Sequence, residues 1–277
     1  MGESESPRFI PASALTLEAF AQLYTRSFER YFYPMEQTTE GFAARVRNEQ
    51  LDLYRSVALM MGDRPAGQAT LALRGERAWC GGFGIVPEFR GQRLGPPLFA
   101  ELVAQARKAS AKILTLEALT RNAPALSVYT GAGMRVRRDV RLLEWKRAAQ
   151  PPKAVFTPAA ASMAEVAGCF YRLHPVPAVW GRDLPSLLLQ HGLLQLHASA
   201  ERGLDGYVLF TLHESEARIA DLAANHVEVA TALLAQLQTH CSKITSINEP
   251  ADSPLTAAFD ICEFTEFDRQ HELAMAL

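Results

Sequence analysis

The spacing of hydrophobic residues changes several times along the 277-residue chain, which predicts helices alternating with strands. From Thr16 the apolar positions recur every three or four residues, so we expect an amphipathic helix with Thr16 as its N-cap. Its apolar stripe consists of Leu17, Phe20, Leu23, Tyr24 and Phe28. An aromatic cluster before Pro34, made of Phe28, Tyr31, Phe32 and Tyr33, is expected to end this helix.

The rest of the first half is expected to form a mixed α/β arrangement. We predict strands over residues 8–12, 56–61, 68–75, 79–86, 113–119 and 140–145, and helices over 40–51 and 97–109. A short further helix is expected to follow Asn122 and to end at Gly131 and Gly133.

A polar, proline-containing stretch over residues 146–160 is typical of a linker, and a similar pattern starts again after it. Helices are expected over 164–173 and 227–240, and strands over 193–199, 206–213, 216–223 and 243–247. Because 277 residues suffice for two domains that each bury a core, we expect one domain at residues 1–147 and another at 148–277.

Composition narrows the function classes. A formal net charge of −2 gives no bulk attraction to nucleic acid or to an anionic membrane, so neither is an expected partner. No apolar run reaches the roughly 20 residues that span a bilayer, and we expect no signal peptide. The four cysteines show neither a C-x-x-C pair nor metal-ligand spacing, which favours a reduced, cytoplasmic setting and predicts no metal site.

The candidate chemistry lies in residues 78–133. A strand that ends at Val86 is followed by a basic, glycine-containing turn over residues 90–95, and then by a helix that starts at Pro96 and Pro97. Such a turn points several backbone N–H groups outward at the positive end of a helix dipole, where a phosphate or pyrophosphate binds readily. We therefore predict a nucleotide-type cofactor at this turn.

Two motifs in this stretch resemble those of the GNAT family of acetyl-CoA-dependent N-acetyltransferases. The family's phosphate loop has the pattern Arg/Gln-x-x-Gly-x-Gly/Ala, and its later motif has Asn, then Tyr seven positions on, then Gly-Phe four and five positions further. The corresponding residues are Arg90, Gly91, Gln92, Arg93, Leu94 and Gly95 in the first motif, and Asn122, Tyr129, Gly133 and Met134 in the second. The resemblance covers roughly residues 8–145. It implies a mixed α+β domain, with a largely antiparallel sheet flanked by helices.

The resemblance also implies roles for these residues, with acetyl-CoA as the cosubstrate that residues 90–95, Asn122 and Tyr129 would bind. A splayed strand would offer backbone N–H groups to the acetyl carbonyl and to pantetheine, and its residues are Phe83, Gly84, Ile85 and Val86. Tyr129 would be the general acid, with a packed core tyrosine as the alternative. Glu117 lies where the family's ribosomal-protein N-terminal acetyltransferases carry a general base, and the alternative is a buried partner of an arginine.

The acceptor is expected to be a small-molecule or N-terminal amine. An α-amine has a pKa near 7.7, whereas lysine, near 10.4, would cost about 4.6 kcal/mol to deprotonate at pH 7, so a single weak base favours an α-amine or a small polyamine. In the family the segment between the first two helices borders the acceptor pocket, so residues 31–35 have that role or belong to the core. A homodimer is left open as a further partnership.

Two departures from the family pattern motivate an alternative. Arg93 stands where the family often has glycine, which costs about 1–2 kcal/mol if the position needs a positive φ. Pro96 removes an amide that could have contacted pyrophosphate. The alternative function is therefore a non-catalytic acyl-CoA-binding or interaction module.

An internal similarity indicates that the second domain is a degenerate copy of the first. Residues 122–133 align with residues 248–259 at a period of 126, with Asn122 matching Asn248. In this alignment Leu255 stands at the position of Tyr129 and Phe259 at that of Gly133, and no glycine turn precedes the helix at residue 227. We therefore expect a tandem repeat of two GNAT-like domains with chemistry only in the first.

Overall fold

The computed structural model describes residues 6–148, 158–200 and 203–277, so the middle of the expected linker, residues 149–157, lies outside the described residues. The chain divides into two compact units. Unit 1 comprises Met1–Arg137 together with Glu272–Leu277, and unit 2 comprises Arg138–His271.

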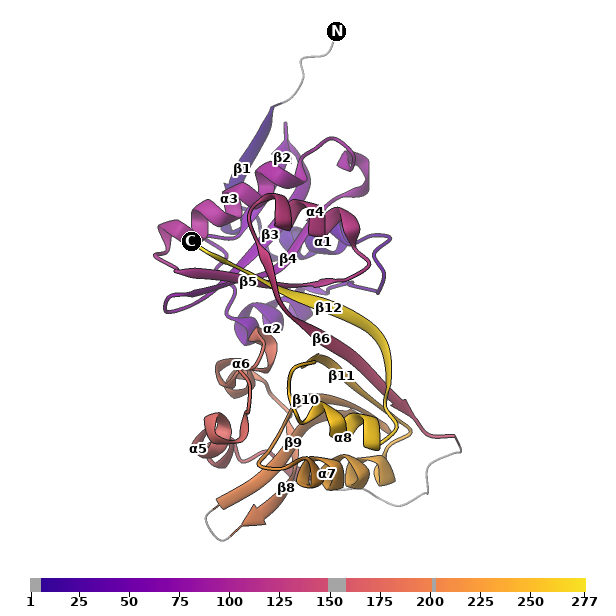
Figure 1. Cartoon of the computed structure of the whole chain (residues 1–277). Coiled ribbons are helices and arrows are strands. Elements are labelled where there is room, and N and C mark those ends of the chain that lie inside the picture. Colours follow the sequence, from indigo (N-terminus) through magenta and orange to yellow (C-terminus); the bar gives the residue numbers. More distant parts are fainter. Residues whose placement is uncertain (1–5, 149–157, 201–202) are drawn as a thin grey trace. The chain divides into compact units, whose positions relative to one another are not determined.

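Unit 1 contains the elements that the first half of the sequence predicts (Figure 1). In chain order they are β1 (Pro7–Pro11), α1 (Leu17–Ser27), α2 (Thr39–Glu49), β2 (Val57–Met61), β3 (Arg64–Arg74), β4 (Arg77–Ile85), α3 (Gly95–Lys108), β5 (Ile113–Leu119) and α4 (Ala123–Gly131). Short 3-10 helices lie at Ala12–Ala14 and Pro87–Phe89. The helix α1 has its predicted N-cap, since the Thr16 hydroxyl accepts a hydrogen bond from Ala19 N–H at 3.1 Å.

The aromatic cluster was expected to lie at the end of α1, but α1 already ends at Ser27. Arg30 has a φ of 60°, a left-handed conformation that no helix can continue through. Phe28 is the C-cap residue, so the cluster lies in the connection to α2 instead.

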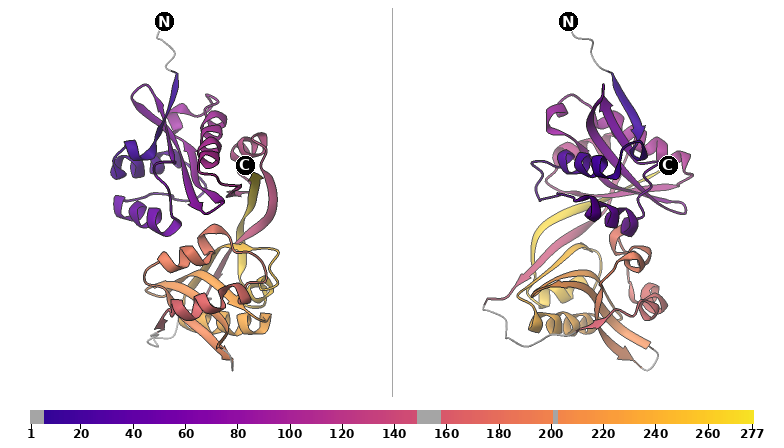
Figure 2. Two further views of the ribbon diagram at one scale, coloured as in Figure 1. Left: turned by 90° about the vertical axis from the view of Figure 1, so that its left-hand side faces the viewer. Right: turned by 180° about the vertical axis from the view of Figure 1, so that it is seen from behind.

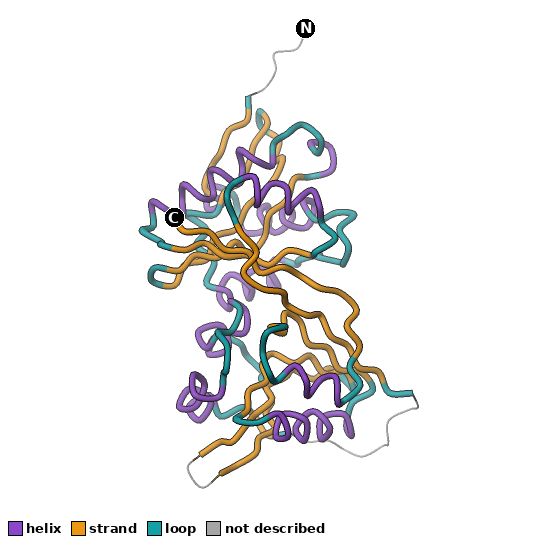
Figure 3. Tube along the Cα trace, in the orientation of Figure 1, coloured by secondary structure: helices purple, strands orange, loops and turns teal. Residues whose placement is uncertain are grey.

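Unit 2 is also built of helices and strands (Figure 3), and from β7 onward its elements repeat the order found in unit 1 from β1 onward. They are β6 (Arg135–Lys146), β7 (Ala159–Ala160), α5 (Met163–Leu173), α6 (Leu184–Leu189), β8 (Leu194–Ala200), β9 (Gly203–His213), β10 (Glu216–Ala224), α7 (Val227–His240), β11 (Lys243–Pro250), α8 (Thr256–Ile261) and β12 (Thr265–Ala276). A 3-10 helix at Trp180–Arg182 and the helix α6 lie in residues 174–192, for which the sequence predicted neither helix nor strand.

The two units divide within β6 rather than in the proline-containing stretch. The strand β6 begins in unit 1, but from Val140 to Lys146 it pairs antiparallel with β11 of unit 2. At the other end of the chain, Glu272–Leu277 belong to unit 1, where the Leu277 N–H donates to the Lys112 carbonyl at 3.0 Å.

Each unit has a mainly antiparallel sheet with one parallel strand pair. The strand order is β1-β2-β3-β4-β5-β12 in unit 1 and β12-β6-β11-β10-β9-β8-β7 in unit 2. The parallel pairs are β4 with β5 and β10 with β11, and a helix connects the two strands in each case. The expected mixed fold, with two similar domains, is confirmed.

Helices cover both faces of each sheet. Successive residues of a strand point to opposite faces, so a strand that is apolar throughout packs against helices on both sides. In unit 1, α1 and α2 lie on one side and α3 and α4 on the other, as the left view of Figure 2 shows. In β9 of unit 2, Val208 and Phe210 pack with α7 and α8, while Tyr207 and Leu209 pack with α5 and α6. No helix within the described residues is long and apolar enough to cross a membrane.

The first prediction concerns the C-terminal segment. Leu273 is fully buried in unit 1 although it lies more than 130 residues beyond the rest of that unit. Leu273→Ala should lower the free energy of unfolding by about 2–5 kcal/mol through lost apolar contacts and a cavity. Denaturant unfolding measures this loss, and the partly exposed Leu277→Ala is the matched control. Hydrogen exchange should become faster in β5; faster exchange confined to unit 2 would contradict the assignment of this segment.

Candidate active site

The central feature of unit 1 is a gap that opens between β4 and β5. Their parallel pairing runs from Arg77 and Ile113 only as far as Trp79 and Thr115, whereas β4 stays paired with β3 up to Ile85. A bulge at Gly81 interrupts the β3–β4 ladder at the point where β4 leaves β5. The second half of β4 therefore has one edge that no described strand covers.

Two residues of β4 present their backbone groups to this gap. Val86 N–H donates to the Ala66 carbonyl at 2.9 Å, so Val86 faces β3. Hydrogen-bonding direction alternates along an antiparallel strand, which turns the backbone groups of Gly84 toward β3 and those of Phe83 and Ile85 toward the gap. Of the four residues that the sequence proposed for this edge, Phe83 and Ile85 are the ones that can donate into the gap.

The predicted phosphate turn follows β4 and leads into α3. Gly91 has a φ of 77° and Arg93 a φ of 58°, so the chain is left-handed at both positions. For the arginine this conformation costs about 1 kcal/mol. The N–H groups of five consecutive residues, 91–95, donate no hydrogen bond to a backbone or side-chain acceptor within the described residues. Together with the positive end of α3 they form an anion-binding terminus.

Pro96 and Pro97 occupy the first turn of α3. Proline fits this position because an N–H there has no partner within the helix. The turn therefore ends at the Gly95 N–H, which is the last amide before the prolines.

The side chains of the turn differ in what they do. The Arg90 guanidinium donates to the carbonyls of Ile85 at 2.9 Å, Ser27 at 3.2 Å and Glu29 at 2.8 Å. The Gln92 amide donates to the Glu88 carbonyl at 3.2 Å. Leu94 is buried, whereas Arg90 and Arg93 are both exposed; the Arg90 guanidinium is engaged by backbone carbonyls.

Tyr129 lies beside the turn on the α3 and α4 side of the sheet. Its ring centroid is 5.6 Å from that of Phe83 and 5.0 Å from that of Phe99, and the residue is 6% exposed. Burial, with smaller contributions from Cys80 and Tyr31, raises the pKa of the Tyr129 phenol well above 10. The hydroxyl is thus protonated at neutral pH, as a proton donor must be.

Glu117 accepts a hydrogen bond from an indole. Its carboxylate accepts a hydrogen bond from Trp79 Nε1 at 2.8 Å, which joins β5 to β4 near the point where the two strands separate. Glu117 lies on β5 and Tyr129 on α4, so the two candidate catalytic groups belong to different elements.

Asn122 serves as the N-cap of α4, with its side-chain oxygen accepting from Ala125 N–H at 3.4 Å. This capping role explains an asparagine at the end of β5 without a ligand. The adjacent Arg121 donates to the Tyr33 hydroxyl at 3.1 Å and lies 4.5 Å from the Phe32 ring centroid. Arg121 therefore holds the aromatic connection between α1 and α2 against the end of β5.

Sequence reasoning assigned Tyr24 only to an apolar stripe and left Arg45 unmentioned. Tyr24 is fully buried, its hydroxyl has no hydrogen-bond partner among the described residues, and burial raises its pKa. The Arg45 guanidinium lies 4.7 Å from the Tyr24 ring centroid and donates to the Gly81 carbonyl. The sequence signal that could have indicated a close approach to β4 was the pair Gly81 and Gly82. A Cβ on Gly82 would lie 2.6 Å from Tyr24 Cε2.

The internal alignment at a period of 126 is wrong, and the structure gives 130 for this segment. Met134 N–H donates to the Tyr129 carbonyl at 3.0 Å, and Phe264 N–H donates to the Phe259 carbonyl at 2.9 Å. Gly133 and Glu263 both have positive φ, 96° and 58°. The sequence alignment was displaced by four residues, about one helical turn, because it matched chance identities. Phe259, not Leu255, occupies the position of Tyr129.

The connection from β4 to α3 in unit 1 corresponds to the connection from β10 to α7 in unit 2, and the two differ in length. It comprises residues 86–94 in unit 1 but only Asn225 and His226 in unit 2. Unit 2 therefore lacks the whole turn, as well as a tyrosine at the position of Tyr129.

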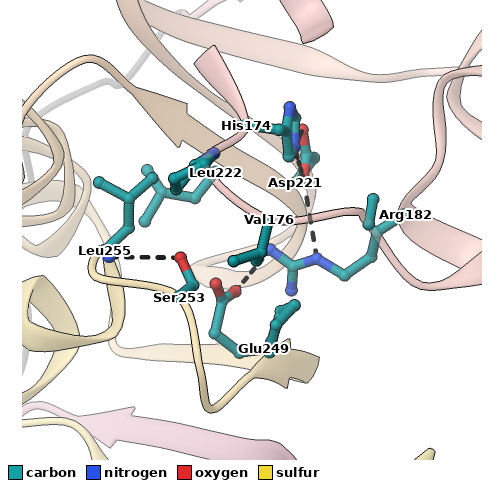
Figure 4. A pocket seen from close by; sticks show the side chains of 11 residues that line it. His174, Val176, Arg182, Asp221, Leu222, Glu249, Ser253 and Leu255 are labelled. Carbon is teal, nitrogen blue, oxygen red and sulfur yellow. Dashed lines mark hydrogen bonds and ion pairs between the residues drawn. The ribbon is translucent and has the colours of Figure 1, made fainter. Parts of the chain in front are cut away.

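Unit 2 instead contains a buried network of charges (Figure 4). Arg182 lies between Asp221 and Glu249, at 3.7 Å and 2.6 Å from their carboxylates. Tyr207 donates to Asp221 at 2.9 Å, and His174 Nε2 is 3.2 Å from the same carboxylate. Asp221 follows a bulge in β10 as Gly82 follows the bulge in β4. A carboxylate with its partners thus stands where unit 1 has a glycine.

Both ring nitrogens of His174 face acceptors, an arrangement that favours the protonated imidazole. Nδ1 is 2.8 Å from the Phe170 carbonyl, and Nε2 faces Asp221. Although burial opposes a charged imidazole, the Asp221 carboxylate raises the pKa of His174, and the pKa of Asp221 is lowered in turn by His174 and Arg182. Burial raises the pKa of Glu249, the second carboxyl group of the network.

Comparison with known proteins identifies part of the chain. Residues 17–134 match the family model described as "Acetyltransferase (GNAT) family". No curated protein matches the chain.

Several solved structures share the fold over nearly the whole chain. A putative acetyltransferase from Pyrococcus horikoshii has a TM-score of 0.69 at 15% identity, covering 100% of this chain and 91% of its own. A GCN5-related N-acetyltransferase from Sphaerobacter thermophilus gives 0.69 at 16%, with coverages of 98% and 95%. A tandem GNAT protein from the clavulanic acid biosynthesis pathway gives 0.66 at 16%, with 98% of both chains.

The second prediction concerns the pH dependence of stability. Because the pKa of His174 is raised in the folded state, its contribution is fully present below pH 6.5 and is lost as pH rises through the folded pKa. Asp221 acts oppositely, contributing above pH 3.8 and losing its contribution as pH falls through its lowered pKa. His174→Gln should therefore remove a loss of unfolding free energy that the wild type shows as pH rises above 6.5.

Denaturant unfolding across that pH range measures the effect, with the exposed His191→Gln as control. Asp221→Asn should cost about 3–5 kcal/mol near pH 6, since it leaves buried cations without their partner. Identical pH profiles for the wild type and His174→Gln would contradict the charged state assigned to His174.

Proposed function

Because residues 17–134 form a domain of the GNAT acetyltransferase family, we propose that the chain is an acetyl-CoA-dependent N-acetyltransferase. It transfers the acetyl group to a primary amine by direct attack in a ternary complex. The observation that carries the proposal is the row of five N–H groups at residues 91–95, which have no acceptor within the described residues and lead into the positive end of α3.

The turn fits a pyrophosphate. Its N–H groups and the exposed Arg93 guanidinium supply hydrogen bonds and a positive charge, and the left-handed conformation of Gly91 and Arg93 turns successive amides to one side. Pro96 contributes no donor, so binding depends on the amides up to Gly95.

The edge of β4 holds the reacting part of the cosubstrate, which supplies an activated acetyl thioester. The N–H groups of Phe83 and Ile85 face the gap and donate hydrogen bonds to the pantetheine arm and the acetyl carbonyl. A fixed backbone donor at the carbonyl stabilises the negative charge that develops there during attack. The gap is therefore both the binding site and the source of electrostatic stabilisation.

Tyr129 donates its phenolic hydrogen to the departing sulfur. A thiol has a reference pKa near 8.5, below that of the buried phenol, so complete proton transfer is uphill and the hydroxyl acts mainly by hydrogen bonding as the C–S bond breaks. The contacts with Phe83 and Phe99 fix the ring in place for this role.

Glu117 is the proposed base that accepts a proton from the acceptor amine. The hydrogen bond from Trp79 fixes its carboxylate on β5, beside the gap. The acceptor is a small-molecule or N-terminal amine, because one weak carboxylate suits an amine that is partly neutral near pH 7.

Unit 2 is proposed to be a degenerate copy that binds no cosubstrate. Support comes from its two-residue connection in place of the turn, and from Phe259 at the position of Tyr129. All four cysteines are buried and free, which fits the proposed reducing, cytoplasmic environment.

A panel of amines tests the function directly. Purified protein with acetyl-CoA should release free CoA thiol only when an acceptor amine is present, with the acetylated amine identified by mass spectrometry. Binding of acetyl-CoA without turnover on α-amines, polyamines and lysine would favour the non-catalytic acyl-CoA-binding module instead.

The third prediction tests Tyr129 as the proton donor. Tyr129→Phe keeps the ring contacts and removes only the hydroxyl, so kcat should fall about 10²- to 10⁴-fold while the Kd of acetyl-CoA stays within about threefold. Steady-state kinetics and calorimetry measure the two quantities. The exposed Tyr54→Phe is the control, and an unchanged kcat in Tyr129→Phe would remove Tyr129 from the mechanism.

The fourth prediction tests Glu117 as the base. Glu117→Gln can still accept the hydrogen bond from Trp79, so the local geometry is retained. Its kcat/KM should fall about 10²-fold at pH 7, and the deficit should shrink as pH rises above the pKa of the acceptor amine. A deficit that is the same at every pH would mean that Glu117 has a structural role only.

A further inference from the structure

The side chain of Arg90 links the phosphate turn to a different part of unit 1. Two of its three hydrogen bonds go to the carbonyls of Ser27 and Glu29, at 3.2 Å and 2.8 Å. Ser27 is the last residue of α1, where carbonyl groups lack helical partners and the helix dipole is negative. Arg90 thus caps the carboxyl end of α1 from the turn.

The third hydrogen bond of Arg90 acts on the gap itself. Its Nε donates to the Ile85 carbonyl at 2.9 Å, which is one of the groups that face away from β3. With this carbonyl engaged, Ile85 presents its N–H to the gap. The three hydrogen bonds hold the guanidinium in this place and engage its Nε and one of its two terminal nitrogens.

The segment that Arg90 caps leads toward the reacting groups. Directly after α1 come Phe28 and Tyr31, whose ring centroids are 5.2 Å apart. Arg121 holds the next two aromatic residues, Phe32 and Tyr33, at the end of β5. Contacts therefore run from the turn through Arg90 to the connection between α1 and α2, and from that connection to the end of β5.

Comparison of the two units separates this link from the general needs of the fold. In unit 1, Arg26 of α1 also forms an ion pair with Glu88 at 2.6 Å. Unit 2 has a similar contact, since Arg172 of α5 donates to Asn225 Oδ1 at 3.0 Å. Unit 2 has no counterpart of Arg90, because its two-residue connection omits the turn. The Arg90 link is therefore present in the unit that has the turn and absent from the unit that has the same fold without the turn.

We propose that Arg90 is a positioning residue that couples occupancy of the phosphate turn to the order of residues 28–37, on the amine side of the gap, while Arg93 carries the charge that attracts phosphate. This inference rests on the proposed function. It predicts that acetyl-CoA orders the connection after α1 and so favours binding of the amine second.

The test compares Arg90→Gln with Arg93→Gln in the full-length protein. For Arg90→Gln, the Kd of acetyl-CoA should stay within about threefold, while the KM of the acceptor amine rises about tenfold or more. For Arg93→Gln, the Kd of acetyl-CoA should rise about tenfold with the acceptor KM unchanged. Arg90→Lys, which retains the charge but not the three-way fork, is used in the same way if Arg90→Gln does not fold.

A readout independent of turnover is hydrogen exchange at the amides of Glu29 and Tyr31, which donate within the turn after α1. Acetyl-CoA should slow their exchange in the wild type and in saturated Arg93→Gln, but not in Arg90→Gln. Loss of acetyl-CoA affinity in Arg90→Gln as large as in Arg93→Gln, or an unchanged acceptor KM, would overturn the coupling. If wild-type protein fails to bind acetyl-CoA, the proposed function itself falls, and this inference falls with it.

Discussion

The parting of β4 from β5 is the constraint on which the rest of unit 1 depends. Their ladder ends at Trp79 and Thr115, so the backbone of β4 beyond that point has an edge without a partner strand. Unpaired backbone groups in a protein interior are costly, and such an edge persists where another molecule satisfies it. The turn at residues 91–95, the ring of Tyr129 and the carboxylate of Glu117 are all arranged around this edge.

The two units differ around the same bulged strand of the fold. In each unit a bulged strand, β4 or β10, pairs with a parallel strand, β5 or β11, and a helix connects the two strands. Unit 1 uses nine residues to connect strand and helix, has Gly82 after its bulge, and leaves Tyr24 without a hydrogen-bond partner among the described residues. Unit 2 uses two residues, has Asp221 after its bulge, and fills the neighbourhood with the ion pairs of Arg182 and His174. In unit 2 these ion pairs occupy the region that corresponds to the surroundings of Gly82 in unit 1.

The elements of both units could be predicted because periodicity and capping are local. Thr16 and Asn122 show this, since each caps the helix that its position predicts. What failed depended on partners distant in sequence. The strand β6 looked like the end of the first domain, yet β11, about 100 residues later, pairs with it. The local motif predicts Arg90 as a phosphate ligand but could not show the carbonyls of Ser27 and Glu29, some 60 residues earlier, to which Arg90 donates. The sequence alignment of the repeat was displaced by one helical turn because it relied on a few residue identities that arise by chance. The matching backbone hydrogen bonds of the two units give the correct alignment.

Calorimetric titration of acetyl-CoA into the full-length protein tests the central claim most directly, with the number of sites per chain as the quantity measured. The account predicts one site, because only unit 1 has the turn with five N–H groups that lack acceptors among the described residues. Two sites would contradict the conclusion that unit 2 has lost the turn's function. No binding at micromolar concentrations would contradict the assignment of the turn and of the gap in unit 1 as the acetyl-CoA site.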